Sequence, residues 1–110
     1  MRTIVYILLL FSAFNVPAAP SGEQLLAACN DSLMHDFQGI NGVMCAWYVT
    51  PCDCEKGKET LPKICLTEPV STATLAKTVV AGLRKHPELQ REDAEFAAAS
   101  ILSQVYSCPE

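Results

Sequence analysis

Apolar residues recur with helical spacing in four segments of the chain, and they almost nowhere alternate with the period of two that is typical of a strand. The first segment covers residues 21–35. Ser21, followed three residues later by Gln24, has the pattern of a capping box at the start of a helix. The expected apolar face of this helix consists of Leu25, Leu26, Cys29 and Leu33.

The second segment, residues 37–50, is apolar along most of its length and is ended by Pro51. Gly39 and Gly42 lower its intrinsic helix propensity, so tertiary packing must hold its first turns. The residues at positions i, i+3, i+4, i+7 and i+8 predict a buried face with Trp47 in the core. These residues are Ile40, Val43, Met44, Trp47 and Tyr48.

The third segment runs from about Thr72 to His86, with Ser71 as its expected N-cap and Pro87 as its stop. Lys85 and His86 lie in its last turn, where positive charge suits the helix dipole. Its predicted apolar stripe consists of Leu75, Val79, Gly82 and Leu83.

The fourth segment is predicted to start near Arg91, and its first turn is acidic, as the helix dipole prefers. Phe96 lies on the side opposite its apolar stripe and is either a second packing contact or an exposed anchor. The predicted stripe consists of Ala94, Ala97, Ala98, Ile101, Leu102, Val105 and Tyr106. The four segments together predict an all-α fold, a small four-helix domain of two antiparallel helical hairpins.

Six cysteines allow a geometric test of those hairpins. If the first helix pair turns about Phe37, Cys29 and Cys45 face each other, because they are equally distant from the turn. If the second pair turns near Glu88, Cys108 faces a position close to Cys65. We therefore predict the disulfides Cys29–Cys45 and Cys65–Cys108, which staple the two hairpins.

Cys52 and Cys54 lie two residues apart in the loop between the second and third helices. A zinc site usually needs about four ligands, and His35 and His86 are not spaced as a ligand pair. A redox site usually has Cys-x-x-Cys, which these two cysteines do not form. The carboxylate of Asp53, which lies between them, also disfavours the thiolate form of either cysteine. A bridge between the two cysteines and links outside the chain both remain open, and no metal, cofactor or catalytic residue is expected.

The N-terminal residues 1–18 have the features of a secretory signal peptide. Arg2 supplies positive charge, the apolar run that follows is shorter than the ~20 residues of a membrane span, and Val16 and Ala18 suit a cleavage site. A membrane anchor is the alternative interpretation. We expect a mature domain of residues 19–110 in the periplasm, where an even number of cysteines in a small domain is typical of disulfides.

The chain has a formal net charge of −4, which becomes −5 without Arg2 because seven basic residues then face twelve acidic ones. This balance disfavours nucleic acid and anionic membranes as partners and suits a basic protein surface. Acidic side chains in the loop after Pro51 could meet the rim of a basic cleft, and Phe96 could serve as an aromatic anchor. The candidate partner-contacting residues are Asp53, Glu55, Glu59 and Phe96.

The second half of the chain resembles the Rap/Tai family of type VI secretion immunity proteins. The matching features are a leucine before a His-Pro-Glu turn and an alanine-rich helix that ends in an aromatic residue and a cysteine. They correspond to Leu83, His86, Pro87, Glu88, Tyr106 and Cys108, with the weaker matches "LLAAC" (25–29), "CAWYV" (45–49) and "ICLTEPV" (64–70). Trp47 stands where the family usually has glycine, and Cys52 and Cys54 are not part of the pattern.

The resemblance implies a small helical periplasmic protein, often a homodimer, that binds a secreted effector and blocks its active-site cleft. In the better-known cases the effector is a peptidoglycan amidase, and the immunity protein itself catalyses nothing. Three other functions compete. They are a disulfide-linked periplasmic stress chaperone, a cysteine-stapled lipid carrier, which would need more cysteines, and a cysteine hydrolase, which would need a histidine in a motif with a cysteine.

Overall fold

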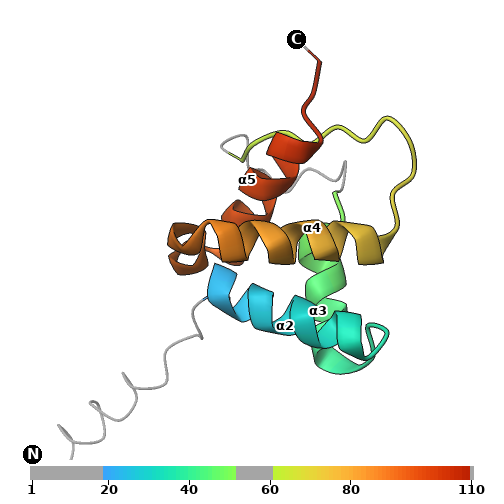
Figure 1. The fold of residues 1–110 in the computed structure, drawn as a ribbon, viewed down its shortest axis with the longest axis vertical. Helices are drawn as coiled ribbons and strands as arrows, with labels where there is room; N and C mark the ends of the chain where they lie inside the picture. Colours follow the sequence, from blue (N-terminus) through green and yellow to red (C-terminus); the bar gives the residue numbers. More distant parts are fainter. Residues whose placement is uncertain (1–18, 52–60, 110) are drawn as a thin grey trace, which may run out of the picture.

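The computed structural model of the protein describes residues 19–51 and 61–109 (Figure 1). The helices are α2 (Gly22–Met34), α3 (Gly39–Val49), α4 (Thr72–Lys85), the 3₁₀ helix η1 (Pro87–Arg91) and α5 (Ala94–Val105). Within these two ranges there is no strand, only an isolated bridge between Ser21 and Asp93. The prediction of an all-α, four-helix domain is confirmed.

Helix α4 crosses the middle of the molecule in Figure 1, with α2 beside it, and every pair of the four α-helices is in contact. The packing is close enough at one crossing that Gly82 of α4 has no room for a side chain. A Cβ atom there would lie 2.5 Å from the Cγ2 atom of Ile101 in α5. The helices therefore share one core.

The caps predicted from the sequence are present. The Ser21 hydroxyl accepts a hydrogen bond from the Gln24 backbone N–H at 3.2 Å, and the Gln24 side chain accepts one from the Ser21 N–H at 2.9 Å. At the start of α4, the Ser71 hydroxyl accepts from the Thr74 N–H at 3.1 Å. These bonds satisfy donors that a helix start leaves unpaired, so both helices begin where the sequence predicts.

Helix α5 begins later than predicted, at Ala94 instead of near Arg91. The preceding residues form η1, and the backbone after it is bonded to the start of α2. The Glu92 carbonyl accepts from the Gly22 N–H at 2.8 Å, and the Ala94 N–H donates to the Pro20 carbonyl at 2.8 Å. These two bonds hold the chain in an extended conformation between η1 and α5, so Glu92 and Asp93 precede the helix.

The turn between α2 and α3 lies at Phe37, as the hairpin geometry predicts. Asp36 and Phe37 both have positive φ angles, 53° and 59°, and the Phe37 N–H donates to the Ser32 carbonyl at 2.9 Å. The turn brings the Phe37 backbone against Gly42, where any side chain would overlap it. Gly42 therefore weakens the helix locally but permits the contact that holds its first turns.

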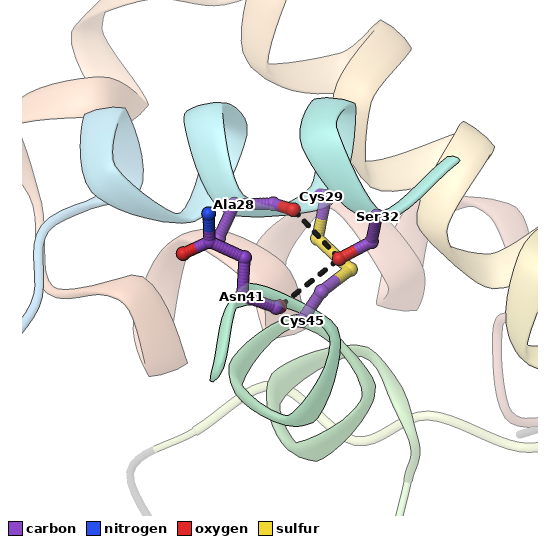
Figure 2. Close-up of a disulfide and its surroundings, with 5 residues drawn as sticks. All are labelled: Ala28, Cys29, Ser32, Asn41 and Cys45. Carbon is purple, nitrogen blue, oxygen red and sulfur yellow. Dashed lines mark hydrogen bonds between the residues drawn. A yellow bond between two sulfur atoms is a disulfide. The ribbon is translucent and has the colours of Figure 1, made fainter. Parts of the chain in front are cut away.

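Both predicted disulfides are present, each with a Cα–Cα distance of 4.9 Å. Cys29–Cys45 joins α2 to α3 and is fully buried, whereas Cys65–Cys108 is half-buried and joins the segment before α4 to the chain end after α5. Figure 2 shows the first bridge beside Ser32. Cys52 and Cys54 lie outside the described residues.

Ser32 is a buried polar residue next to the Cys29–Cys45 bridge. Its hydroxyl lies 2.7 Å from the Ala28 carbonyl oxygen and 3.0 Å from that of Asn41, and it can donate its one proton to either (Figure 2). Because Ala28 belongs to α2 and Asn41 to α3, the hydroxyl and the disulfide connect the same two helices.

The cores of α4 and α5 match the predicted stripes closely. Leu75, Val79 and Leu83 are buried in α4. In α5 the prediction is wrong at its end, since Val105 is 57% exposed and Tyr106 is half-buried at the C-cap. The confirmed members in α5 are Ala94, Ala97, Ala98, Ile101 and Leu102.

The predicted apolar face of α3 is wrong for Ile40, Val43 and Trp47, which are exposed, so Trp47 is not a core residue. Of its other two members, Met44 is half-buried and Tyr48 packs against the core. The residues buried in α3 are Gly42, Cys45 and Val49. The close contact at Gly42 and the disulfide at Cys45 decide which side of the helix faces the core, and both lie on the side that the apolar pattern does not favour.

Candidate protein-binding surface

A group of exposed apolar side chains lies on α3. Ile40 is 86% exposed, Val43 71% and Trp47 60%. Together with Gly39 and Met44 they line a shallow apolar concavity. We call these five residues the α3 face.

The α3 face is exposed because α3 carries large apolar side chains on more than one side and no charged residue on any. Residues 37–51 contain no charged side chain, whereas α4 carries Lys77, Arg84 and Lys85 on its solvent side. A helix that is apolar all round is normally buried on all sides. In a domain of this size α3 lies at the surface, so one of its apolar faces must meet solvent or a partner.

The surface rests on a rigid support. Cys45, on the opposite side of α3, is bonded to Cys29, and both are 0% exposed. The Ser32 hydroxyl and the Asn41 side chain add links to α2, since the Asn41 amide donates to Asp31 at 3.1 Å. A surface held this firmly loses little conformational freedom when it binds, which favours affinity.

Phe96, the aromatic residue predicted to be either a packing contact or an anchor, lies in α5 with 40% of its surface exposed. Its neighbours Ala97 and Ala98 are buried in the core. The Phe96 ring therefore extends from a well-packed helix, and part of the ring is accessible to a partner. The other predicted contacts, Asp53, Glu55 and Glu59, lie outside the described residues.

The histidines lie apart from one another, in peripheral positions. His35 is the C-cap residue of α2, with Nδ1 3.0 Å from the Asp31 carbonyl oxygen, and His86 is the C-cap residue of α4, 3.4 Å from the Glu88 carboxylate. In residues 19–51 and 61–109, no group of three or more His, Cys, Asp or Glu side chains is placed to hold a metal ion. No helix within these ranges combines the length and the apolar composition needed to cross a membrane.

The comparison with protein families gives a clear result. The model of the family described as Rap1a immunity proteins matches residues 21–108. The chain belongs to this family. Neither the comparison with curated proteins nor that with solved structures gave a match.

The match to the Rap1a immunity proteins begins at Ser21, the N-cap of α2, and ends at Cys108, the last bridged cysteine. It therefore includes all four α-helices and both disulfides of the described structure, and it confirms the resemblance noted in the sequence. The immunity role of the family implies a cognate effector as binding partner.

The α3 face could not be recognised from apolar spacing alone. Helical spacing of apolar residues usually marks a buried face, so Ile40, Val43, Met44 and Trp47 are predicted from the sequence to belong to the core. One signal in the sequence could have revealed it. Residues 37–51 contain no charge, and a short helix of a small domain that is apolar on every side has more apolar surface than its core can cover.

Proposed function

We propose that this Rap1a immunity protein acts in the periplasm, where it binds a type VI secretion effector that attacks peptidoglycan, most specifically an amidase, and blocks its active-site cleft. The observation that carries the proposal is the family match across residues 21–108, which spans the whole described domain. The two disulfides support the periplasmic location, because such bonds persist in oxidising compartments.

Protection works by occlusion and not by catalysis. The domain is a rigid scaffold in which two disulfides close the two consecutive helix pairs. A rigid inhibitor that fills a substrate cleft binds tightly because little order is lost on association. The protection is then stoichiometric: one bound domain silences one effector molecule.

We assign Phe96 and the acidic loop residues Asp53, Glu55 and Glu59 to the effector contact. Phe96 is a partly exposed aromatic ring on a well-packed helix, which is typical of an interface anchor. The acidic side chains would meet the basic rim of the cleft and speed the encounter of the two proteins.

Co-expression with the candidate effector encoded beside this protein tests the proposal. The effector, directed to the periplasm, should lyse the host, and this protein should restore growth only when it is exported with its N-terminal segment. With purified proteins, peptidoglycan cleavage should fall to zero at stoichiometric amounts of the immunity protein. Growth arrest that persists with every neighbouring candidate would contradict the proposal.

Phe96→Ala sharpens the test. Loss of an aromatic anchor should raise the inhibition constant by about 10-fold or more. Val105→Ala is the matched control, because Val105 is also an exposed apolar residue of α5 and its truncation should leave inhibition unchanged. Equal inhibition by the Phe96→Ala variant and the wild type would remove Phe96 from the contact.

A further inference from the structure

The two disulfides have different surroundings, and the difference indicates chemistry at one of them. Cys29–Cys45 joins two helices inside the core, whereas Cys65–Cys108 is half-buried and joins two segments that are not helical. We propose that Cys65–Cys108 is a redox site of the folded domain, which a dithiol–disulfide oxidoreductase forms and opens while the helices stay packed. The proposal goes beyond the proposed function and does not depend on effector binding.

Cys29–Cys45 is closed to thiols in the folded domain. Both residues are 0% exposed, and both belong to the buried core. Thiol–disulfide exchange begins when a thiolate attacks a disulfide sulfur, so a sulfur that solvent does not reach reacts only after the structure opens. Both cysteines also lie within helices, where the backbone is held by helical hydrogen bonds.

Cys65–Cys108 is open to an attacking thiolate. Both residues are half-buried, and Leu66, Ser107 and Pro109, which are next to them along the chain, are exposed. The bridge therefore lies at the surface of the domain. Because access to the sulfur limits the rate of exchange, exposed disulfides are the labile or regulatory ones in proteins.

The backbone at this bridge suits the active site of a protein catalyst. Cys65 lies between α3 and α4, in a segment without helix, and Cys108 follows the end of α5 at Val105. The Cys65 N–H donates to the Tyr106 carbonyl at 2.9 Å, which places the two segments side by side. A segment without helical hydrogen bonds can adapt its backbone to an enzyme cleft, whereas a cysteine within a helix cannot do so unless the helix unfolds.

The helical core does not include this bridge. The buried core consists of residues from all four α-helices, and it contains Cys29 and Cys45 but neither Cys65 nor Cys108. Ile64 only packs against this core as a partly buried residue. Opening the bridge therefore frees the segment before α4 from the end of the chain, while the contacts among the four helices remain.

The reaction consists of two exchange steps. A thiolate of the oxidoreductase attacks Sγ of Cys65 or Cys108, the bridge breaks, and a mixed disulfide forms while the other cysteine leaves as a thiolate and takes up a proton from solvent. The second thiolate of the oxidoreductase then attacks the mixed disulfide and releases the second cysteine, which is also protonated. The two cysteines gain two electrons and two protons, and the dithiol of the oxidoreductase becomes a disulfide. The reverse steps form the bridge.

Limited reduction of the oxidised, folded protein tests the proposal, with Cys29–Cys45 as the control within the same molecule. The probes are dithiothreitol and reduced thioredoxin, a Cys-x-x-Cys oxidoreductase, both without denaturant and without effector. New thiols are alkylated and mapped by mass spectrometry. Cys65–Cys108 should open at least about 100-fold faster than Cys29–Cys45, because the buried bridge must wait for the structure to open. Circular dichroism should show native helix content throughout.

A trapping experiment identifies the sulfur that is attacked. Thioredoxin with its second active-site cysteine replaced by serine cannot complete the reaction, so it should accumulate as a mixed disulfide with Cys65 or Cys108. The chain used carries Cys52→Ser and Cys54→Ser, so that the adduct forms only at the two described bridges. Adding Cys65→Ser and Cys108→Ser should abolish the adduct and leave the helix content native.

Four results would overturn the proposal. They are equal opening rates of the two bridges, opening of Cys65–Cys108 only when helix content is lost, opening by dithiothreitol but not by thioredoxin, and loss of the fold in the variant without Cys65 and Cys108. Because these measurements contain no effector, each of these results is distinguishable from a failed immunity function, which co-expression measures separately.

Discussion

Helices α3 and α5 have similar lengths and apolar content, but their apolar stripes have opposite environments. Both are short, rich in apolar and small residues, and carry a stripe of apolar side chains at helical spacing. In α5 most of the stripe is buried against α4, whereas in α3 the corresponding stripe faces solvent. Apolar spacing therefore identifies a face of a helix, but it does not say whether this face belongs to the core or to an interface.

The difference arises from the contacts on the other side of each helix. The opposite side of α5 carries Glu95 and Phe96, and a charged side chain there disfavours burial of that side. The opposite side of α3 carries Gly42, which contacts the Phe37 backbone, and Cys45, which is bonded to Cys29. The first contact requires close approach to the turn at Phe37 and the second to α2, so together they determine the orientation of α3 regardless of its larger apolar side chains.

Removing the disulfides should lower the free energy of unfolding more than any other change to these two helices. Replacing Cys65 and Cys108 by alanine releases a loop of 43 residues beside α5, and should lower the free energy of unfolding by about 4 kcal/mol. Replacing Cys29 and Cys45 releases a loop of 16 residues beside α3, and should cost about 3 kcal/mol. Urea unfolding followed by circular dichroism measures both.

Alanine substitution removes one chosen bridge, whereas a reductant acts on every cysteine of the unfolded chain. If the Cys29–Cys45 bridge orients α3, its removal should also change Trp47 emission in the folded state, and removal of Cys65–Cys108 should not. If neither double-alanine variant lowered the free energy of unfolding, the bridges would form in the folded protein without stabilising it.

Truncation in α5 should be the next largest effect. Leu102 is 1% exposed, so Leu102→Ala should lower the free energy of unfolding by about 2–5 kcal/mol through lost burial and a cavity. Val105→Ala, one turn further along the same helix, should change it by less than about 0.5 kcal/mol because Val105 is mostly exposed. Comparable losses at the two positions would contradict the division of α5 into a buried and an exposed side.

A matched pair of valines in α3 gives the smallest and most specific test. Val49 is 0% exposed and Val43 is 71% exposed. Val49→Ala should cost about 1–3 kcal/mol, and Val43→Ala less than about 0.5 kcal/mol. The unfolding curves should be recorded in dilute solution, so that association of copies does not contribute. If Val43→Ala destabilised the protein more than Val49→Ala, the buried side of α3 would be the one that the sequence alone predicts.

Much of the fold was determined by local sequence signals. Ser21 and Ser71 cap their helices because a serine hydroxyl at the N-cap accepts a hydrogen bond from a free N–H of the first turn. This interaction is local and does not depend on the rest of the fold. The turn at Phe37 predicted Cys29–Cys45, because the two residues are equally far from it, and a second turn near Glu88 predicted Cys65–Cys108 with an offset of a few loop residues. The family relationship could also be predicted from the sequence, because the motifs of the family are turns, helices and cysteines that appear directly in the sequence.

Only the tertiary structure decided which side of α3 is buried and where α5 begins. The first depends on the contact of Gly42 with the backbone of the turn at Phe37, and the second on hydrogen bonds from Gly22 and Ala94 to distant backbone carbonyls. The spacing of apolar residues along the sequence contains neither the backbone path of a turn nor a hydrogen bond between segments far apart in the chain. The exposed apolar surface of α3 is their consequence, since a helix with apolar side chains on more than one side exposes whichever face its partners leave uncovered.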